Sequence, residues 1–266
     1  MRLSHPMAPY RGLPPEDVFF VANDMQIQMG TGYVMRFFQY ELYPAQPLHI
    51  YVQIEAQPSA RNLLLGALLA RADQLRAETP HLKGRIYAEV LPDDADMISF
   101  YLKNGFRNDD TEELLRFPLP QYPARTPMSC QLASVPLRNE SEQDLFLARL
   151  NAYRIPGIDR DFLTLCMQQQ HFLAIGFYKG REPVSEVLFS GSGSQATLII
   201  IYVRADFRRK GIAKALLAAA SEILRSRGAT HILTQIYTRN IQQASLMRSL
   251  SADKLRTVTL FPGMDL

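Results

Sequence analysis

A short basic turn between two apolar segments is the part of the sequence best suited to chemistry. Residues 208–213, RRKGIA, follow the apolar, β-branched run 196–203 and lead into a stretch with helical spacing, 212–227. The first backbone N–H groups of a helix have no internal acceptor, and the helix dipole adds positive potential there. Gly211 allows an anion to approach closely, and Ala213 keeps the next turn small. The turn therefore predicts a binding site for the phosphates of a nucleotide.

Other nucleotide-binding patterns do not fit this turn. It lacks the Lys-Ser/Thr pair that ends a nucleoside triphosphate loop, and the three spaced glycines of dinucleotide-binding folds. A charged surface turn in front of an amphipathic helix is the alternative interpretation, since such turns are common. The elements predicted around the turn are needed to distinguish a phosphate-binding turn from a charged surface turn.

The chain divides at a Pro-rich stretch, residues 117–127, which has no apolar period and is typical of a linker. Behind it, short apolar runs alternate with segments of helical spacing. For this second half the sequence predicts strands at 131–135, 172–178, 184–190, 196–203, 231–237 and 255–261, and helices around 142–151, 161–170, 212–227 and 240–250.

The first half ends in the same order of elements as the second. Leu68 corresponds to Leu216, and Tyr101 to Met247, at nearly the same offset along the chain. Two such anchors indicate duplication of a β-α-β-α-β unit. Upstream, the first half has room for strands but not for paired helices, so we expect a truncated copy. Its expected strands are 18–22, 48–54, 85–90 and 112–117, with further strand residues in 25–43, and its helices are 63–77 and 95–103.

Residues 203–217, VRADFRRKGIAKALL, resemble the acetyl-CoA-binding motif of the GNAT N-acetyltransferases, whose pattern is Arg/Gln-x-x-Gly-x-Gly/Ala between a strand and a helix. Asn240 and Ala244 match that family's second cofactor motif, and FYLKNGF at 100–106 is similar to the end of the same motif. The resemblance implies an α/β (α+β) fold. It implies two tandem GNAT-like domains, each a mixed, mostly antiparallel sheet flanked by helices, with the N-terminal copy truncated.

The two expected domains have diverged. In residues 60–65, ARNLLL, leucines stand where the motif needs a glycine and a small residue, so they would fill the space of the phosphates. We therefore expect residues 1–120 to form a degenerate GNAT-like domain with a structural role. Residues 128–266 keep the turn and are expected to form the acetyltransferase domain with the acetyl-CoA site.

The resemblance implies an N-acetyltransferase, an acyltransferase that moves an acetyl group from its cosubstrate acetyl-CoA to an amine of a small molecule or peptide. The pantetheine arm is expected to pair with the splayed end of the strand at 199–203, where a backbone N–H near Tyr202 or Val203 would face the thioester carbonyl. The implied cofactor-binding residues are Ile201, Tyr202, Val203, Arg208, Arg209, Lys210, Gly211, Ile212, Ala213, Lys214, Asn240 and Met247.

A base has to take a proton from the ammonium form of the acceptor. Glu186 is the best-placed carboxylate, and Asp206 and Tyr202 come next as candidate bases, although Glu186 as an exposed strand residue is the alternative. Met247 stands where family members often carry a tyrosine that protonates the departing thiolate, and a thioether cannot donate a proton. The intact turn favours an active enzyme, whereas the missing tyrosine favours an inactive coenzyme A-binding sensor or scaffold.

The acceptor is not specified by the sequence. By the resemblance, residues 152–161 would form its cleft, and Tyr153, Arg154, Asp159 and Arg160 would select it or simply solvate a loop. Nucleic-acid binding through the basic residues is a third, weaker hypothesis. The net charge is only +3, and the basic residues are not interleaved with aromatics in a stacking pattern.

Composition sets the remaining expectations for a chain of 266 residues. Cys130 and Cys166 are too few for a disulfide framework, so we expect buried free thiols in the cytoplasm. The five histidines show no metal-ligand spacing, so no metal is expected. Apolar runs are too short to span a membrane, and prolines interrupt any secretory core. We expect acetyl-CoA and an amine as partners, no nucleic acid, no membrane, and a monomer or homodimer.

Overall fold

The computed structural model describes residues 1–123, 125–154 and 157–266. The chain forms two compact units. Unit 1 comprises Met1–Thr111 and Thr259–Leu266, and unit 2 comprises Glu112–Val258. In the described residues, no helix has the length and apolar character needed to cross a bilayer.

Unit 1 is built on a six-stranded sheet in the order β1-β2-β3-β4-β5-β13. The pair β4 and β5 is parallel, and the other neighbours run antiparallel. The sheet is therefore mixed and mostly antiparallel, as expected. Its strands are β1 (Arg2–Ser4), β2 (Val18–Ala22), β3 (Gln28–Phe38), β4 (Leu48–Ala56), β5 (Gly84–Tyr87) and β13 (Gly263–Asp265), and the short 3-10 helix η1 (Pro15–Asp17) precedes β2.

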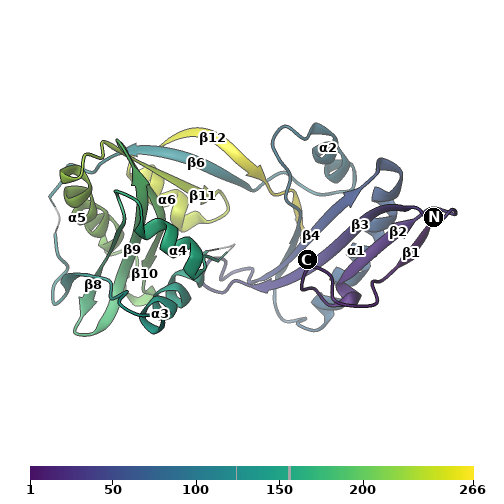
Figure 1. Ribbon diagram of the computed structural model, residues 1–266, viewed down its shortest axis with the longest axis horizontal. Helices are drawn as coiled ribbons and strands as arrows, with labels where there is room; N and C mark the ends of the chain where they lie inside the picture. The colour runs from purple at the N-terminus through teal and green to yellow at the C-terminus, as the bar shows by residue number, and fades with distance from the viewer. Residues whose placement is uncertain (124, 155–156) are drawn as a thin grey trace. The chain divides into compact units, whose positions relative to one another are not determined.

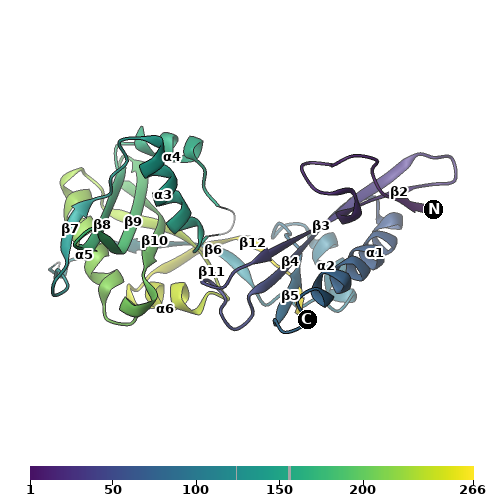
Figure 2. The same ribbon diagram turned by 90° about the horizontal axis from the view of Figure 1, so that it is seen from below.

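The helices α1 (Pro58–Ala77) and α2 (Ala95–Lys103) lie on one side of this sheet (Figure 2). Helix α1 buries a stripe at helical spacing, with Leu64 and Leu68 fully buried against the strands. The helix begins at Pro58, so residues 60–65, which we aligned with the phosphate-binding turn, lie inside its first turns. A continuous helix leaves no turn at this place in unit 1.

Unit 2 is built on a seven-stranded sheet in the order β12-β6-β11-β10-β9-β8-β7. The central pair β10 and β11 is parallel, and the pairs β9–β10, β8–β9, β7–β8 and β6–β11 are antiparallel. The predicted fold class, with a mixed sheet in each of two tandem units, is confirmed. The strands are β6 (Thr111–Pro118), β7 (Gln131–Ser134), β8 (Leu173–Lys179), β9 (Glu182–Ser192), β10 (Gln195–Val203), β11 (His231–Tyr237) and β12 (Asp253–Leu260).

Helices cover both faces of the unit 2 sheet, as Figures 1 and 2 show. One face packs against α5 (Ile212–Ser226) and α6 (Ile241–Ser249), in a core that includes Leu216, Leu217 and Met247. The other face packs against α3 (Glu140–Asn151) and α4 (Arg160–Met167), in a core that includes Phe146 and Leu163. Unit 1 lacks the counterparts of α3 and α4 among its described residues, which agrees with the predicted truncation.

Two strands join the sheet of the other half of the sequence. We expected β6 to close the sheet of the first half, but it pairs antiparallel with β11 in unit 2. In the opposite direction, β13 at the C-terminal end of the sequence pairs antiparallel with β5 in unit 1. Strand propensity marks a segment as a strand without specifying its partner. The predicted domain bounds, 1–120 and 128–266, follow the two copies along the sequence and stay a prediction.

Candidate functional site

The two parallel strands at the centre of unit 2 part half-way along their length. Strand β10 pairs with β11 from Gln195 to Leu198, opposite His231 to Thr234. On its other side β10 stays paired with β9 as far as Val203. In the part of the chain that the structure describes, no strand therefore pairs with the β11-facing edge of residues 199–203. Apart from the carbonyl oxygens of Ile199 and Val203, which accept hydrogen bonds from Arg154 and Arg208, main-chain groups of this edge are available to an extended ligand.

A bulge lies where the strands part. Leu198 pairs with Phe189 and Ile200 with Leu188, so Ile199 is an extra residue on β10. An extra residue reverses the alternation of faces along a strand. Ala196 and Leu198 belong to the core below α5, whereas Ile200 and Tyr202 belong to the core below α3 and α4. The bulge thus directs Tyr202 to the α3 side and leaves Ile201 and Val203 packed on the α5 side.

The predicted phosphate turn follows directly. The 3-10 helix η2 (Ala205–Phe207) ends at Arg208, and α5 begins at Ile212 with Gly211 as its N-cap residue. Gly211 has the left-handed backbone angles φ 76° and ψ 2°, and no side chain caps the helix. Arg209 is also left-handed, at φ 61°. This conformation costs a non-glycine residue about 1 kcal/mol, and such strain is concentrated at functional loops.

The space beside Gly211 is open, because a Cβ built on it would meet nothing within 4 Å. The leading N–H groups of α5 have no acceptor within the helix. The turn therefore offers main-chain donors, a positive dipole end and free volume together. This combination fits a diphosphate.

The three basic side chains of the turn are used differently from one another. Arg209 is exposed, as expected for a residue that adds charge at the turn. Lys210 donates to the Asp206 carbonyl oxygen at 2.9 Å and lies over the Phe207 ring. Arg208 turns inward: its Nε donates to the Val203 carbonyl oxygen at 3.0 Å. Its charge is thus less directly available to a phosphate than the sequence suggested.

Arg208 also ties the turn to the segment behind α3. Its Nη2 donates to the Tyr153 hydroxyl at 3.0 Å, and its guanidinium lies over the Tyr153 ring. The Tyr153 ring in turn lies 5.1 Å from the ring of Tyr202, centroid to centroid. These contacts bring together the turn, the splayed strand and the expected acceptor segment.

Residues 137–250 match the sequence model of the acetyltransferase (GNAT) family. This segment is a GNAT domain. A comparison with curated proteins gives no match to the chain.

Several solved structures are similar to most of this chain, and the first two named here, with TM-scores above 0.5, share its fold. A conserved protein of unknown function from Enterococcus faecalis V583 is 12% identical with a TM-score of 0.53, and covers 92% of this chain and 61% of its own. Eis1 from Mycobacterium abscessus is 12% identical with a TM-score of 0.52, and covers 92% of this chain and 63% of its own. A GCN5-related N-acetyltransferase from Sphaerobacter thermophilus is 15% identical with a TM-score of 0.48, covering 96% of this chain and 82% of its own. This chain spans about three fifths of the first two proteins.

In the GNAT domain, Glu186 is buried rather than exposed, with none of its surface accessible. Arg149 on α3 donates Nε to its Oε2 at 2.7 Å and Nη2 to its Oε1 at 2.8 Å. Tyr178 donates its hydroxyl to Oε1 at 2.8 Å, and burial together with this carboxylate raises the pKa of Tyr178. Gly176 makes room, because a Cβ there would come within 3.0 Å of Glu186 Cγ.

The two predicted catalytic residues lie side by side. Tyr202 on β10 stands opposite Glu186 on β9 in the strand register. Both oxygens of Glu186 already accept hydrogen bonds, and the carboxylate is held in an ion pair with Arg149. Asp206, the other candidate carboxylate, is held by Arg204, whose guanidinium lowers the pKa of that carboxyl. Asp206 is therefore a weaker proton acceptor than a free carboxylate, while Glu186 is engaged by Arg149 and Tyr178.

Two predicted cofactor contacts have structural tasks in the GNAT domain. Asn240 is the N-cap of α6, where its side chain accepts from the Gln243 N–H at 3.1 Å. Met247 is 4% exposed and packs in the core with α5. Contact of either residue with coenzyme A stays a prediction. Ile201, Val203, Ala213 and Lys214 are half-buried along the splayed strand and the first turn of α5, and Ile212 is buried.

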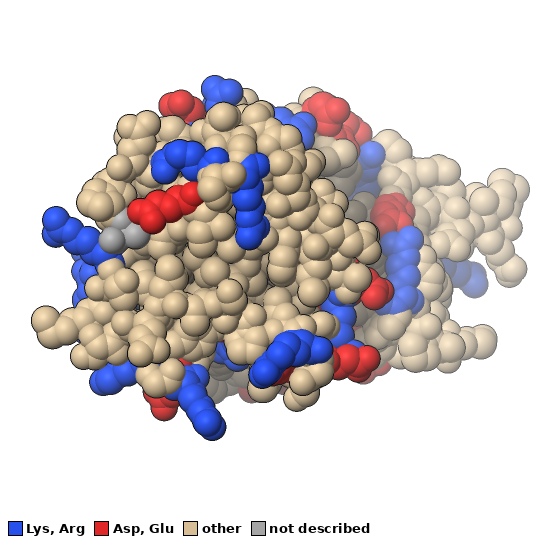
Figure 3. All heavy atoms as spheres, turned by 60° about the vertical axis from the view of Figure 1, so that its left-hand side comes forward, with Lys and Arg blue, Asp and Glu red and all other residues tan. Residues whose placement is uncertain are grey.

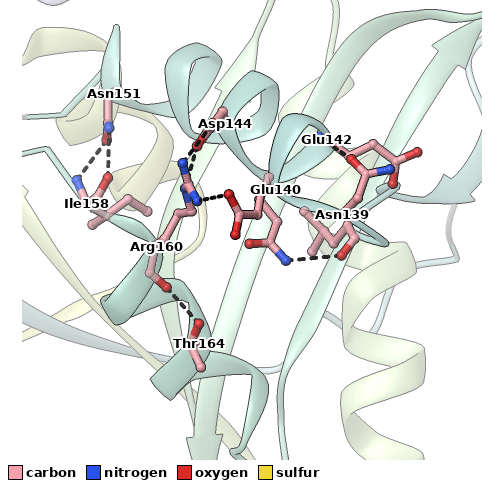
Figure 4. Close-up of polar contacts among 10 residues, drawn as sticks. Asn139, Glu140, Glu142, Asp144, Asn151, Ile158, Arg160 and Thr164 are labelled. Atoms are coloured by element: carbon pink, nitrogen blue, oxygen red, sulfur yellow. Dashed lines mark hydrogen bonds and ion pairs between the residues drawn. The ribbon is translucent and has the colours of Figure 1, made fainter.

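The expected acceptor segment, residues 152–161, is only partly described, because 155 and 156 lie outside the described residues. The last residues of this segment, 158–161, line one side of an open hollow of about 580 Å³ between α3 and α4, near the contacts drawn in Figure 4. Arg160 bridges to α3 there through Asp144 and Glu140, at 2.8 and 2.6 Å. Asp159 caps α4 by accepting from the Phe162 N–H at 2.8 Å. The polar residues of this segment thus support the helices at least in part.

Sequence reasoning missed Arg149 and Tyr178, which surround Glu186. The available signal was the position of Arg149 in a helical segment, one residue before the buried Leu150. The two cysteines are free and buried, as predicted. Burial raises the pKa of Cys166, which disfavours its reactive thiolate. Among the described residues, no three His, Cys, Asp or Glu side chains converge on a point.

Proposed function

We propose that unit 2 binds acetyl-CoA and transfers its acetyl group to an amine acceptor. The observation that carries the proposal is the left-handed, uncapped turn at Gly211, set beside a strand whose edge residues 199–203 are free of β11. Membership of residues 137–250 in the GNAT family supports it. With both thiols free, we further propose the cytoplasm as its location.

Each part of the site has a task in this proposal. The pyrophosphate lies against the N–H groups at the start of α5, with Arg209 and Lys210 adding positive charge. The pantetheine arm extends along residues 199–203 in the manner of an added strand. A main-chain N–H near Tyr202 or Val203 stabilises the oxyanion that develops on the thioester carbonyl.

The proposed reaction forms a C–N bond and breaks a C–S bond. The ammonium form of the acceptor gives one proton to water or the protein, and the amine nitrogen then attacks the acyl carbon. As the C–S bond breaks, the nitrogen gives a second proton to water or the protein, and the sulfur leaves as a thiolate that takes up one proton. Glu186 already accepts three hydrogen bonds, two of them from Arg149. We therefore propose that the hydroxyl of Tyr202 transfers the proton of the acceptor amine. Glu186 and Arg149 then act as positioning residues, because their ion pair fixes β9, the strand that pairs with β10 opposite Tyr202.

A coenzyme A-binding module without turnover is the second candidate. The ion pair that engages Glu186 favours it, and so does Met247, because a thioether has no proton to donate. Nucleic-acid binding gains no support from the face of unit 2 shown in Figure 3, where Lys and Arg are scattered over a largely uncharged surface.

The experiment measures Tm with acetyl-CoA, with coenzyme A and with a short DNA duplex, followed by thiol release over a panel of amines. We expect both coenzymes to raise Tm and an amine to release thiol. A rise in Tm without thiol release would favour the module without turnover. Stabilisation by the duplex alone would reject both candidates.

A further inference from the structure

Arg154 carries a positive charge into the layer between α4 and the splayed strand. Its Nη1 donates to the carbonyl oxygen of Ile199, the bulge residue of β10, at 3.3 Å. The side chain is half-buried, and among the described residues its buried Nε has no hydrogen-bond partner. Its charge also reaches Cys166 on α4, because it opposes the rise in the pKa of that thiol.

Several other arginines of unit 2 are paired with carboxylates. Arg149 is paired with Glu186, Arg204 with Glu182 and Asp206, and Arg160 with Glu140 and Asp144. In the described part of the chain, no carboxylate oxygen lies within 4.0 Å of the Arg154 guanidinium. A partly buried charge without a counter-ion is unfavourable. An anion that enters with a ligand would relieve that cost.

The position of this charge connects it to the acceptor. Ile199 lies where β10 separates from β11. Tyr202 follows on the same strand, and both residues pack on the side of the sheet that α3 and α4 cover. The proposed function places the acceptor amine on this face. The carboxylates that line the outer hollow, Asp144, Asp159 and Asp161, are solvent-exposed, so water and salt screen them more than the half-buried guanidinium.

We propose that Arg154 binds an anionic group of the acceptor, so the acceptor class is amines that also carry a carboxylate or a phosphate. The inference rests on the proposed acetyl transfer. A guanidinium presents several N–H donors in one plane and matches either anion, whereas an ammonium acts as a point charge. Carboxylate and phosphate share this chemistry, and the substrate pairs below distinguish them.

The test compares thiol release from acetyl-CoA with matched amines that differ in one charge. The first pair is an amino acid and its carboxamide, measured across several side chains. The second pair is O-phosphoethanolamine and ethanolamine. In the unmodified protein we expect kcat/KM to be about 10-fold or more higher for the anionic member of at least one pair, in line with a hydrogen bond to a charged group.

Variants assign that preference to Arg154. Arg154→Gln should lower the ratio within the preferred pair to near one, and Arg154→Lys should keep part of it. A general structural defect would lower kcat/KM for both members and leave the ratio unchanged. Arg181→Gln, which removes an exposed arginine from the turn between β8 and β9, should also leave the ratio unchanged. If Arg154→Gln does not fold, Arg154→Lys provides the test. A reduction of about threefold or more in its kcat/KM ratio for the preferred pair would support the inference.

The outcomes separate this inference from the proposed function. Thiol release without preference for the anionic amines would overturn the inference and leave acetyl transfer standing. So would a preference that Arg154→Gln and Arg154→Lys retain in full. If no member of the panel releases thiol, the proposed transfer fails and this inference fails with it.

Discussion

Arg149 and Glu186 form a two-pronged ion pair, Nε to Oε2 at 2.7 Å and Nη2 to Oε1 at 2.8 Å, that joins α3 to the middle of the unit 2 sheet. Glu186 has no accessible surface, while the Arg149 side chain is 30% exposed. Removing one partner leaves the other charge partly buried and uncompensated. The pair therefore holds the helix against the strand opposite Tyr202.

Glu186→Gln should lower the free energy of unfolding by about 2 kcal/mol, somewhat less than a fully buried broken pair because Arg149 is partly exposed. Chemical denaturation measures it. Glu182→Gln on the same strand, which removes an exposed pair with Arg204, should cost less than about 1 kcal/mol. Equal losses in the two variants would show that the buried pair has no special role.

Tyr202→Phe should lower thiol release about 100-fold, the lower range for loss of a proton-transferring group. Acetyl-CoA should still raise Tm as in the unmodified protein, because the main-chain edge of β10 is unchanged. Tyr178→Phe removes the hydroxyl that donates to Glu186 and serves as the matched control, with a reduction below about tenfold. Full activity of Tyr202→Phe would refute a role of its hydroxyl.

Gly211→Leu should abolish the rise in Tm with acetyl-CoA, because the side chain fills the open space beside the turn and strains a left-handed residue. Gly228→Leu is the matched control at the other end of α5, where Gly228 has φ +90° and equally open space. Both variants should lose about 1–2 kcal/mol of stability from backbone strain. Only Gly211→Leu should lose binding, and normal binding by that variant would remove the phosphate assignment.

A fragment of residues 112–258 should fold, whereas a fragment of residues 128–258 should not. Strand β6 lies between β12 and β11, and its Leu115 and Phe117 are 5% and 1% exposed in the core. Without β6, β12 loses its neighbour in the sheet and the edge of β11 that β6 covers is left unpaired. Circular dichroism and cooperative melting of the two fragments would check this. A folded shorter fragment would show that β6 is dispensable.

Asp206→Asn should reduce stability at neutral pH and make no difference in acid. Arg204 lowers the pKa of Asp206 below its unfolded value of about 3.9. A lowered pKa in the folded state stabilises the protein above the unfolded pKa, and this contribution is lost as the pH falls through the folded pKa. The Tm difference between the two proteins should therefore vanish at low pH. High salt should shrink it, because the pair is exposed.

The sequence by itself determined the local elements and the turn. Strand β11 and helix α2 have the predicted bounds, and α5 begins at the predicted Ile212. Period, caps and glycine positions are properties of neighbouring residues, so a sequence displays them directly. The left-handed conformation of Gly211 belongs to the same class of information.

Only the tertiary structure decided which strands and side chains meet. It placed β6 in the sheet of unit 2 and added the unpredicted strand β13 to the sheet of unit 1, and it set the bulge at Ile199 that turns Tyr202 toward α3. It also turned Arg208 inward and closed Arg149 onto Glu186. Strand partners, register and long-range ion pairs depend on residues far apart in the chain. Their choice follows from packing the whole sheet, and no local pattern encodes it.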